Sequence, residues 1–263
     1  MKIGFIGLGN MAGAMMGGII KAGISASDII GYDVTEGARN KTAERDGIVI
    51  ASGNVEVARQ ADVLVLSVKP QYYAEVISQI RDSVREDCLV ITIAPGKTLS
   101  WLKEQFGRSL HIIRCMPNTP ALYGAGCTGY CPNENVTPAD LETAEKLLSS
   151  FSRAYKVDEK LMDVVVGIGG SSPAYVFMFI EAMADAAVSQ GMPRQMAYEM
   201  SAQAVLGSAK MVLESGRHPG ELKDMVCSPA GTTIEAVKVL EELGFRGAVI
   251  DAVDACVEKS RSL

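Results

Sequence analysis

The sequence predicts an α/β domain with a mostly parallel β-sheet, followed by an all-helical domain. Three observations lead to this fold class. Up to about residue 157, short runs rich in Val and Ile alternate with helical stretches, which is typical of parallel strands joined by crossover helices. A glycine-rich turn follows the first of these runs, and after about residue 158 the β-type runs stop. We therefore expect one domain at 1–157 and a second at 158–263.

Six segments of the first domain are predicted to be strands. The first is KIGFIG at 2–7, and the helix after it ends at Gly23. A further helix is expected around 138–152. The other predicted strands are IIGYD (29–33), IVIAS (48–52), DVLVLSVK (62–69), CLVITIA (88–94) and HIIRCM (111–116).

The second domain is predicted to consist of helices that are apolar on most sides. Ala, Met and Gly are frequent in these helices and charges are few, so a lone surface bundle does not account for them. One interpretation is an internal core. We favour a dimerisation domain whose apolar helix faces meet those of another chain, giving a homo-oligomer. The expected helices are 174–192, 194–216, 232–244 and 245–260.

Composition excludes several classes of protein. The net charge is −6 and no block of Lys or Arg occurs, which argues against nucleic-acid and membrane partners. Six cysteines without a CxxC pair and only two histidines predict free thiols and no metal site. The apolar stretch after Lys2 is similar to a signal peptide, but six glycines and Asn10 interrupt it. We expect a cytoplasmic protein.

The segment GLGNMA, from Gly7 to Ala12, matches the dinucleotide-binding pattern G-x-G-x-x-G/A between a strand and a helix. Gly7 permits the tight turn, Gly9 lets a pyrophosphate approach the backbone, and Ala12 keeps helix and strand close. The free N–H groups at the helix start receive the phosphates. The pattern alone is weak evidence, but its agreement with strand, helix and position predicts a nicotinamide dinucleotide as cofactor.

Asp33 stands at the end of the second predicted strand, 21 residues after Ala12. A carboxylate there accepts hydrogen bonds from the adenosine ribose hydroxyls and repels a 2′-phosphate, which favours NADH over NADPH. A solvated turn acid is the competing interpretation. Arg39 is near enough in sequence to pair with a phosphate, so both nucleotides remain open and the cofactor is written NAD(P)H.

Three loops follow later strands, where ligands of open α/β sheets bind. In SVKPQ (67–71), Lys69 and Pro70 form a fixed turn with a cation beside the cofactor phosphate or nicotinamide ribose. The alternative for Lys69 is an ordinary surface lysine. IAPG (93–96) follows the next strand. In MPNTP (116–120), Asn118 is a candidate partner of the ribose or nicotinamide.

The stretch DMVCSPAGTTIEAV, residues 224–237, places a Ser-Pro-Ala-Gly turn directly before a helical run. A helix beginning near Gly231 offers backbone N–H groups and the positive end of its dipole to a carboxylate. Thr232 and Thr233 add hydroxyls, and no acid is expected within the turn. A Ser- or Thr-capped helix without a ligand is the more common outcome of such turns.

This stretch resembles the signature of pyrroline-5-carboxylate reductases, usually a Ser-Pro-Gly-Gly-x-Thr turn. The resemblance extends through GFIGLGNMAGAMMGGI, VKPQ, RCMPNTP and GGSSPAYVF, in order along both halves. Departures are Ala230 in place of the first glycine, Pro95 where Ala is common, and Gly170 before Ser171-Ser172-Pro173. A positive φ at Ala230 would be strained.

The resemblance implies reduction of 1-pyrroline-5-carboxylate to L-proline with NAD(P)H, the last step of proline biosynthesis. It also implies a Rossmann domain, an all-helical C-terminal domain, and homodimers through those helices that sometimes form homodecamers. By similarity, Thr233 hydrogen-bonds the ring nitrogen, while Ser228 and the amides of Gly231 and Thr232 hold the carboxylate. Thr233 and Ser228 are the expected catalytic residues, and Ala230 completes the substrate turn.

The cofactor-binding set combines the motifs above with residues implied by the resemblance. Glu159 falls where the family has an acid near the cofactor and subunit junction, although a Glu that starts a helix explains it equally well. Ser171, Ser172 and Pro173 are expected to line the site or to cap a helix. The full expected set is Gly7, Leu8, Gly9, Asn10, Met11, Asp33, Asn54, Ser67, Lys69, Pro70, Ala94, Gly96, Asn118 and Glu159.

Three alternatives remain at this point. The segment FIGLGNMAGAMM also resembles β-hydroxyacid dehydrogenases, which need a lysine on the helix after a Gly-rich turn. No lysine occurs between Lys160 and Lys210, which favours imine reduction. Reductases of other cyclic imines fit the same carboxylate turn. A non-catalytic NAD(P)-binding regulator would have no reason to carry that turn.

Overall fold

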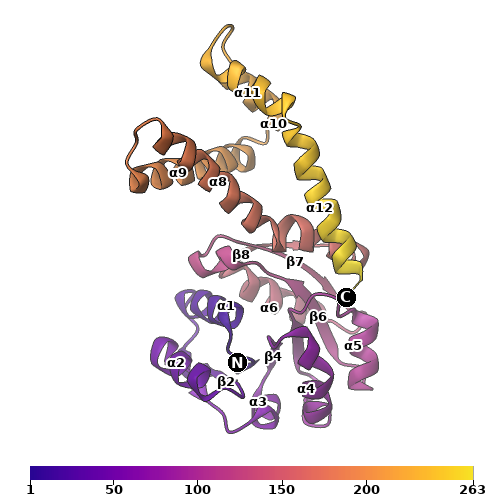
Figure 1. Cartoon of the computed structure of the whole chain (residues 1–263). Coiled ribbons are helices and arrows are strands. Elements are labelled where there is room, and N and C mark those ends of the chain that lie inside the picture. Colours follow the sequence, from indigo (N-terminus) through magenta and orange to yellow (C-terminus); the bar gives the residue numbers. More distant parts are fainter. Residues whose placement is uncertain (263) are drawn as a thin grey trace. The chain divides into compact units, whose positions relative to one another are not determined.

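The computed structural model describes residues 1–262, which fall into two compact units (Figure 1). The first contains Met1–Ser171 and the chain from Cys256 onward, and the second is Ser172–Ala255. The last helix therefore begins in one unit and ends in the other. The expected domain boundary after residue 157 stays a prediction.

The first unit contains an eight-stranded sheet in the order β3-β2-β1-β4-β5-β6-β7-β8. Every neighbouring pair is parallel except β6 with β7, which confirms the predicted mostly parallel sheet. All six predicted strands are present. The strands are β1 Ile3–Ile6, β2 Ile29–Tyr32, β3 Val49–Ile50, β4 Val63–Leu66, β5 Leu89–Thr92, β6 His111–Met116, β7 Gly126–Pro132 and β8 Ser152–Lys156.

Two strands were not predicted from the sequence. β7 reads GCTGYCP, and its two glycines and terminal proline are unfavourable for a strand. It pairs antiparallel with β6, where Cys115 lies opposite Tyr130. β8, SRAYK, is short and polar, and it extends the sheet by pairing parallel with β7. Tertiary pairing, rather than local propensity, makes these segments strands.

Helices cover both faces of the sheet because successive strand residues point to opposite sides. Phe5 belongs to the cluster that packs under α1 and α6, whereas Ile6 belongs to the cluster under α3, α4 and α5. The helices are α1 Asn10–Lys21, α2 Glu36–Asp46, α3 Asn54–Gln60, α4 Tyr73–Ile80, α5 Leu99–Phe106, α6 Pro138–Ser149 and α7 Met162–Val165. Shorter turns are η1 Ala26–Asp28, η2 Pro70–Tyr72, η3 Thr119–Tyr123, η4 Glu159–Leu161 and the π-helix η5 Val166–Gly170.

The second unit is helical, as predicted. Its helices are α8 Ser172–Ser189, α9 Arg194–Ser215, α10 Pro219–Val226, α11 Thr232–Glu242 and the first part of α12 Phe245–Arg261. α8 packs on α9 around the buried Ala184 and Ala197. The rings of Phe179 and Phe245 lie 6.0 Å apart and join α8 to α12. α10 was not predicted.

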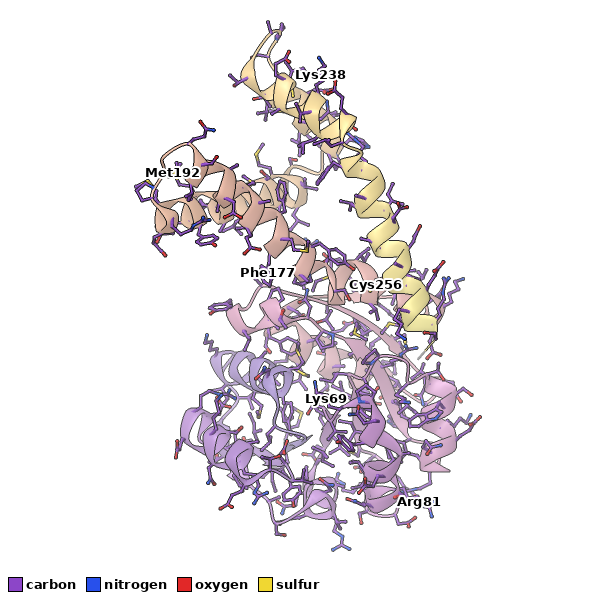
Figure 2. The ribbon with its side chains drawn as sticks, viewed as in Figure 1. Lys69, Arg81, Phe177, Met192, Lys238 and Cys256 are labelled. Carbon is purple, nitrogen blue, oxygen red and sulfur yellow. The ribbon has the colours of Figure 1, made fainter. Side chains whose placement is uncertain are left out.

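Several apolar side chains of the second unit are exposed to solvent in the single chain. Phe177, Met178 and Leu206 are exposed by 61%, 68% and 60%, and Figure 2 labels Phe177 on α8. The helical stretch Glu159–Ser189 has the length and composition of a membrane span. Only 11% of its most apolar window is buried within the single chain. Exposed apolar side chains gathered on neighbouring helices are typical of a surface that a partner covers.

Candidate functional site

The glycine-rich turn lies between β1 and α1, the context that its motif requires. Gly7 has φ 94, and a Cβ there would lie 2.8 Å from the backbone of Ser67, so glycine is needed for both conformation and space. Gly9 is the N-cap of α1, with no side chain capping the helix and open space where a Cβ would point. The first amides of α1 are thus open to an anion.

Asp33 follows β2 directly and is bonded to the glycine turn. Its Oδ2 accepts the N–H of Leu8 at 2.9 Å, and its Oδ1 accepts the N–H of Thr35 at 2.9 Å. Arg39 donates to the carbonyl oxygens of Asp33 and Val34, at 2.6 and 3.2 Å. The Asp33 carboxylate therefore holds the turn as well as facing the end of the sheet, while Arg39 is occupied by backbone carbonyls.

A cleft of about 280 Å³ opens beside this turn. Its lining includes Gly7, Asp33, Asn54, Tyr72, Glu75 and Gln79. Asn54 donates to Gln79 across it at 2.8 Å. Within residues 1–262, no lysine or arginine lines this cleft, and two carboxylates do. A ligand group placed there meets negative rather than positive charge.

The ends of β4 and β5 carry the next two loops. The Ser67 hydroxyl donates to the carbonyl oxygen of Gly7 at 2.7 Å, which joins the β4 loop to the glycine turn. Lys69, labelled in Figure 2, precedes η2, whose first residue is Pro70. The side chain of Lys69 is exposed. Ala94 is buried just after β5. These residues gather at the carboxyl edge of the sheet.

Asn118 is buried and uses its amide within the chain. Its Oδ1 accepts the N–H of Cys127 at 2.8 Å, and its Nδ2 donates to the Gly169 carbonyl in the π-helix at 2.9 Å. π-helical turns often accompany functional sites, and here Asn118 fixes one to the loop after β6. Nearby, the Ser171 hydroxyl accepts from the Cys256 thiol at 3.1 Å. A role of Asn118 at the cofactor stays a prediction.

The Glu159 carboxylate accepts hydrogen bonds from two donors of the first unit. Its Oε1 accepts the N–H of Leu99, at the start of α5, at 2.7 Å and Arg114 Nη1 at 3.0 Å. Arg114 is 3% exposed, and its Nε has no partner within residues 1–262. The pair secures the loop between β5 and α5. Sequence reasoning missed Arg114, although a cation within the apolar strand HIIRCM was the available signal.

The Ser-Pro-Ala-Gly turn lies wholly in the second unit, between α10 and α11. The Gly231 N–H donates to the Ser228 carbonyl at 3.0 Å, and Ala230 has φ 57. A Cβ on Gly231 would come within 2.3 Å of Ser228 Oγ. A larger residue at 231 would therefore crowd Ser228, and the turn places Ala230 in the left-handed region, the strained conformation considered above.

α11 begins at Thr232 with Gly231 as its N-cap and no side-chain cap. Within residues 1–262, the hydroxyls of Ser228, Thr232 and Thr233 make no hydrogen bonds, so they are available to a ligand. The Gly231 N–H donates inside the turn, and Glu235 adds a carboxylate in the first turn of α11, where it opposes an anion. The expected role of the Gly231 and Thr232 amides at a carboxylate stays a prediction.

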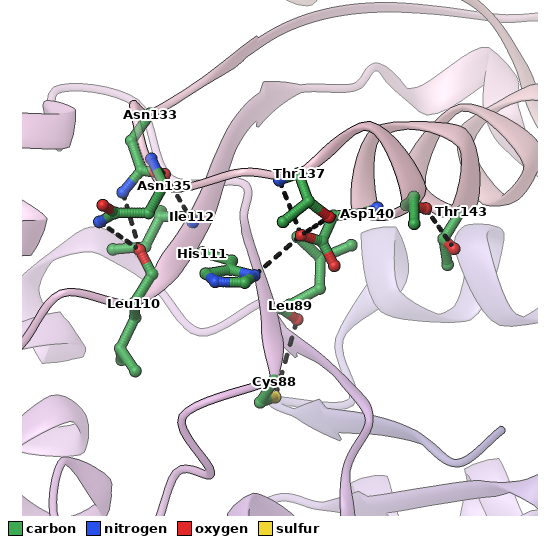
Figure 3. Close-up of polar contacts among 11 residues, drawn as sticks. Cys88, Leu89, Leu110, His111, Ile112, Asn133, Asn135, Thr137, Asp140 and Thr143 are labelled. Atoms are coloured by element: carbon green, nitrogen blue, oxygen red, sulfur yellow. Dashed lines mark hydrogen bonds and ion pairs between the residues drawn. The ribbon is translucent and has the colours of Figure 1, made fainter.

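A separate polar cluster lies at the start of β6 (Figure 3). The Asp140 carboxylate accepts the Thr137 N–H at 2.9 Å and is 2.8 Å from His111 Nδ1. Burial raises the pKa of Asp140, but hydrogen bonds from Thr137 and the His111 contact outweigh it, so the pKa is lowered. Thr137 and Asp140 form a capping box for α6. This cluster stabilises the fold.

Metal ligation has no geometric support here. Across residues 1–262, no three His, Cys, Asp or Glu side chains group as a metal site would require. The first unit carries a dinucleotide turn with an acid at its side, and the second carries an open helix N-terminus with three free hydroxyls.

Two family models match the chain. Residues 159–263 match the model for pyrroline-5-carboxylate reductase dimerisation, and residues 2–96 match the model for NADP oxidoreductase, coenzyme F420-dependent. The chain is 52% identical to pyrroline-5-carboxylate reductase of Escherichia coli (strain K12) over 263 residues, covering 100% of this chain and 98% of that protein.

Two further matches extend the comparison. Pyrroline-5-carboxylate reductase of Methanosarcina acetivorans is 45% identical over 263 residues, covering 100% of this chain and 97% of the relative. The crystal structure of Plasmodium falciparum pyrroline carboxylate reductase with NADP bound has a TM-score of 0.91 and 34% identity. It covers 99% of this chain and 97% of that chain.

Proposed function

The chain belongs to the pyrroline-5-carboxylate reductase family, and we propose that it reduces 1-pyrroline-5-carboxylate to L-proline, the last step of proline biosynthesis. NAD(P)H supplies the hydride when bound. The observation that carries the proposal is that one chain holds both a dinucleotide turn supported by Asp33 and an uncapped helix N-terminus beside Ser228 and Thr233.

The residues at the carboxyl edge of the sheet fit a dinucleotide. Gly9 leaves open space above the first amides of α1, which suits a pyrophosphate. We assign Asp33, which follows β2 beside the glycine turn, to the ribose hydroxyls, and Lys69 adds a cation in the loop after β4. Asp33 and Glu75 in the cleft disfavour a 2′-phosphate, so we propose that NADH is accepted at least as well as NADPH.

The residues of the second turn suit a small cyclic amino acid. The first amides of α11 attract a carboxylate, and Ser228 offers a hydroxyl to the same group. Thr233 is assigned to the ring nitrogen. A protonated imine is already an electrophile, so hydride addition at the imine carbon, which becomes C5 of proline, yields the neutral amine without a strong acid. Binding energy then serves to align the reacting atoms, which agrees with a turn of hydroxyls and amides.

We propose that a second copy of the chain covers the open apolar faces of α8 and α9. The exposed Phe177, Met178 and Leu206 support an interface, and the match of residues 159–263 to a dimerisation model supports a homodimer. Covering Glu159–Ser189 in this way removes the need for a membrane. A larger homo-oligomer, including a homodecamer, is compatible with this interface. The proposed location is the cytoplasm.

A steady-state assay on the purified protein tests the proposed activity. Oxidation of NADH and NADPH is followed with 1-pyrroline-5-carboxylate as substrate, and L-proline is quantified in the same samples. Proline formed in equal amount to the nucleotide oxidised supports the reductase. The six-membered homologue of the imine is the matched control substrate. Turnover of that homologue alone would indicate a different cyclic-imine reductase.

A further inference from the structure

We propose that the hydroxyl of Tyr73 is a positioning group for the dinucleotide, fixing the carboxyl ends of β4 and β5 relative to each other. Two of the expected cofactor loops, those of Lys69 and Ala94, leave from these strand ends. The inference rests on the proposed function, because it takes the carboxyl edge of the sheet as the dinucleotide site.

Tyr73 is the first residue of α4, and its side chain is completely buried. It lies within the apolar cluster that contains Leu66, Val90 and Ala94. Burial raises the pKa of the phenol well above its usual range, so the hydroxyl keeps its proton and can donate. A phenylalanine would fill the same apolar space, so packing alone does not call for the hydroxyl.

The hydroxyl is inserted where the hydrogen-bond ladder between β4 and β5 weakens. Leu66 is the last residue of β4, and Ile93 follows the last residue of β5. The direct bond from the Ile93 N–H to the Leu66 carbonyl is long, at 3.4 Å. The Tyr73 hydroxyl donates to that carbonyl at 2.5 Å and accepts the Ile93 N–H at 3.2 Å. It therefore bridges two strand ends that barely bond directly.

A second hydroxyl fastens the opposite side of β4. Ser67 donates to the Gly7 carbonyl at 2.7 Å and is 3.1 Å from that of Ile6, which joins the end of β4 to β1. The end of β4 is thus held to the glycine turn by Ser67 and to β5 by Tyr73. Removing the Tyr73 hydroxyl leaves the first bond intact and frees the loop of Ala94. The expected defect is in dinucleotide binding.

Tyr73→Phe tests this, with Tyr130→Phe as the matched control. Tyr130 is also buried, and its hydroxyl bonds to Glu145 on α6, away from the ends of β4 and β5. We expect Tyr73→Phe to raise the Kd and KM for NADH and NADPH about fivefold, the effect of one ordinary hydrogen bond. The imine KM and kcat should change less than about twofold. Tyr130→Phe should leave all of these constants unchanged.

The outcomes separate the inference from the proposed function. Unchanged nucleotide affinity in Tyr73→Phe overturns the inference, as does equal weakening in Tyr130→Phe. Failure of the wild-type protein to bind either nucleotide overturns the proposed function and the inference with it. If Tyr73→Phe does not fold, amide hydrogen exchange of Ile93 is measured in the wild-type protein with and without NADH. Slower exchange with NADH supports coupling between the bridged strand ends and the dinucleotide, and an unchanged rate overturns it.

Discussion

The carboxylate of Asp33 accepts the backbone N–H of Leu8 at 2.9 Å, so the acid after β2 is part of the glycine turn that follows β1. One side chain thereby has two tasks. It supports the turn proposed to receive the pyrophosphate, and it presents negative charge to the cleft beside it. A substitution that tests cofactor choice must preserve the first task.

Asp33→Asn comes nearest to that condition, because the amide oxygen can still accept the Leu8 N–H while the charge and the bond from Thr35 are lost. We expect the ratio of kcat/KM for NADPH to that for NADH to rise about tenfold as repulsion of the 2′-phosphate is relieved. Asp28→Asn, just before the start of β2, is the control and should leave the ratio unchanged. An unaltered ratio in Asp33→Asn would mean that the carboxylate does not face the ribose.

Thr233→Ala tests the assignment of the ring nitrogen. The hydroxyl of Thr233 has no partner within residues 1–262, so its loss should cost little folding stability. We expect kcat to fall about tenfold or more, as for a lost hydrogen bond at the reacting centre, with unchanged nucleotide affinity. Thr232→Ala is the neighbouring control, because only the amide of Thr232 is assigned to the substrate. A loss of nucleotide affinity with normal turnover would place Thr233 at the cofactor.

Ala230 has φ 57, a conformation that costs a non-glycine residue about 1 kcal/mol. Ala230→Gly should therefore raise the free energy of unfolding by up to about 1 kcal/mol. Ala236→Gly, in the interior of α11, should lower it by a similar amount. Denaturant unfolding of both variants checks the opposite signs. Equal destabilisation by the two substitutions would contradict a strained turn at Ala230.

The strained turn also illustrates what the sequence can predict. The Ser-Pro-Ala-Gly-Thr-Thr pattern predicted the helix start, and the alanine marked where strain would arise if φ were positive. The sequence pattern could not predict that the Gly231 N–H donates to the Ser228 carbonyl, because that bond depends on the fold of the turn. Glu235 in the same helical turn was visible in the sequence and was overlooked.

The sheet likewise contains strands that the sequence predicts and strands that it does not. Strands buried on both faces, such as β4 with its continuous Val and Leu, were predicted to within a few residues. β7 was missed because its residues are held by neighbours on both sides rather than by their own propensity. The Arg114–Glu159 pair joins residues 45 positions apart, so no local pattern reveals it.

The Asp140 cluster predicts a pH dependence of stability. The pKa of Asp140 is lowered in the folded chain, so its contribution is present above the unfolded pKa and is lost as pH falls through the folded value. Asp140→Asn should lower the free energy of unfolding near neutral pH by on the order of 1 kcal/mol, with a smaller difference in acid. The exposed Glu142→Gln on α6 is the control. A difference independent of pH would contradict the assignment.

The most direct test of the account follows the hydride itself. The protein is mixed with 1-pyrroline-5-carboxylate and NADH or NADPH that carries deuterium at C4 of the nicotinamide, on the face that is transferred. The account predicts L-proline with one deuterium, bound to C5. Proline without deuterium, or nucleotide binding without any proline, would contradict hydride transfer from the nicotinamide to the imine carbon.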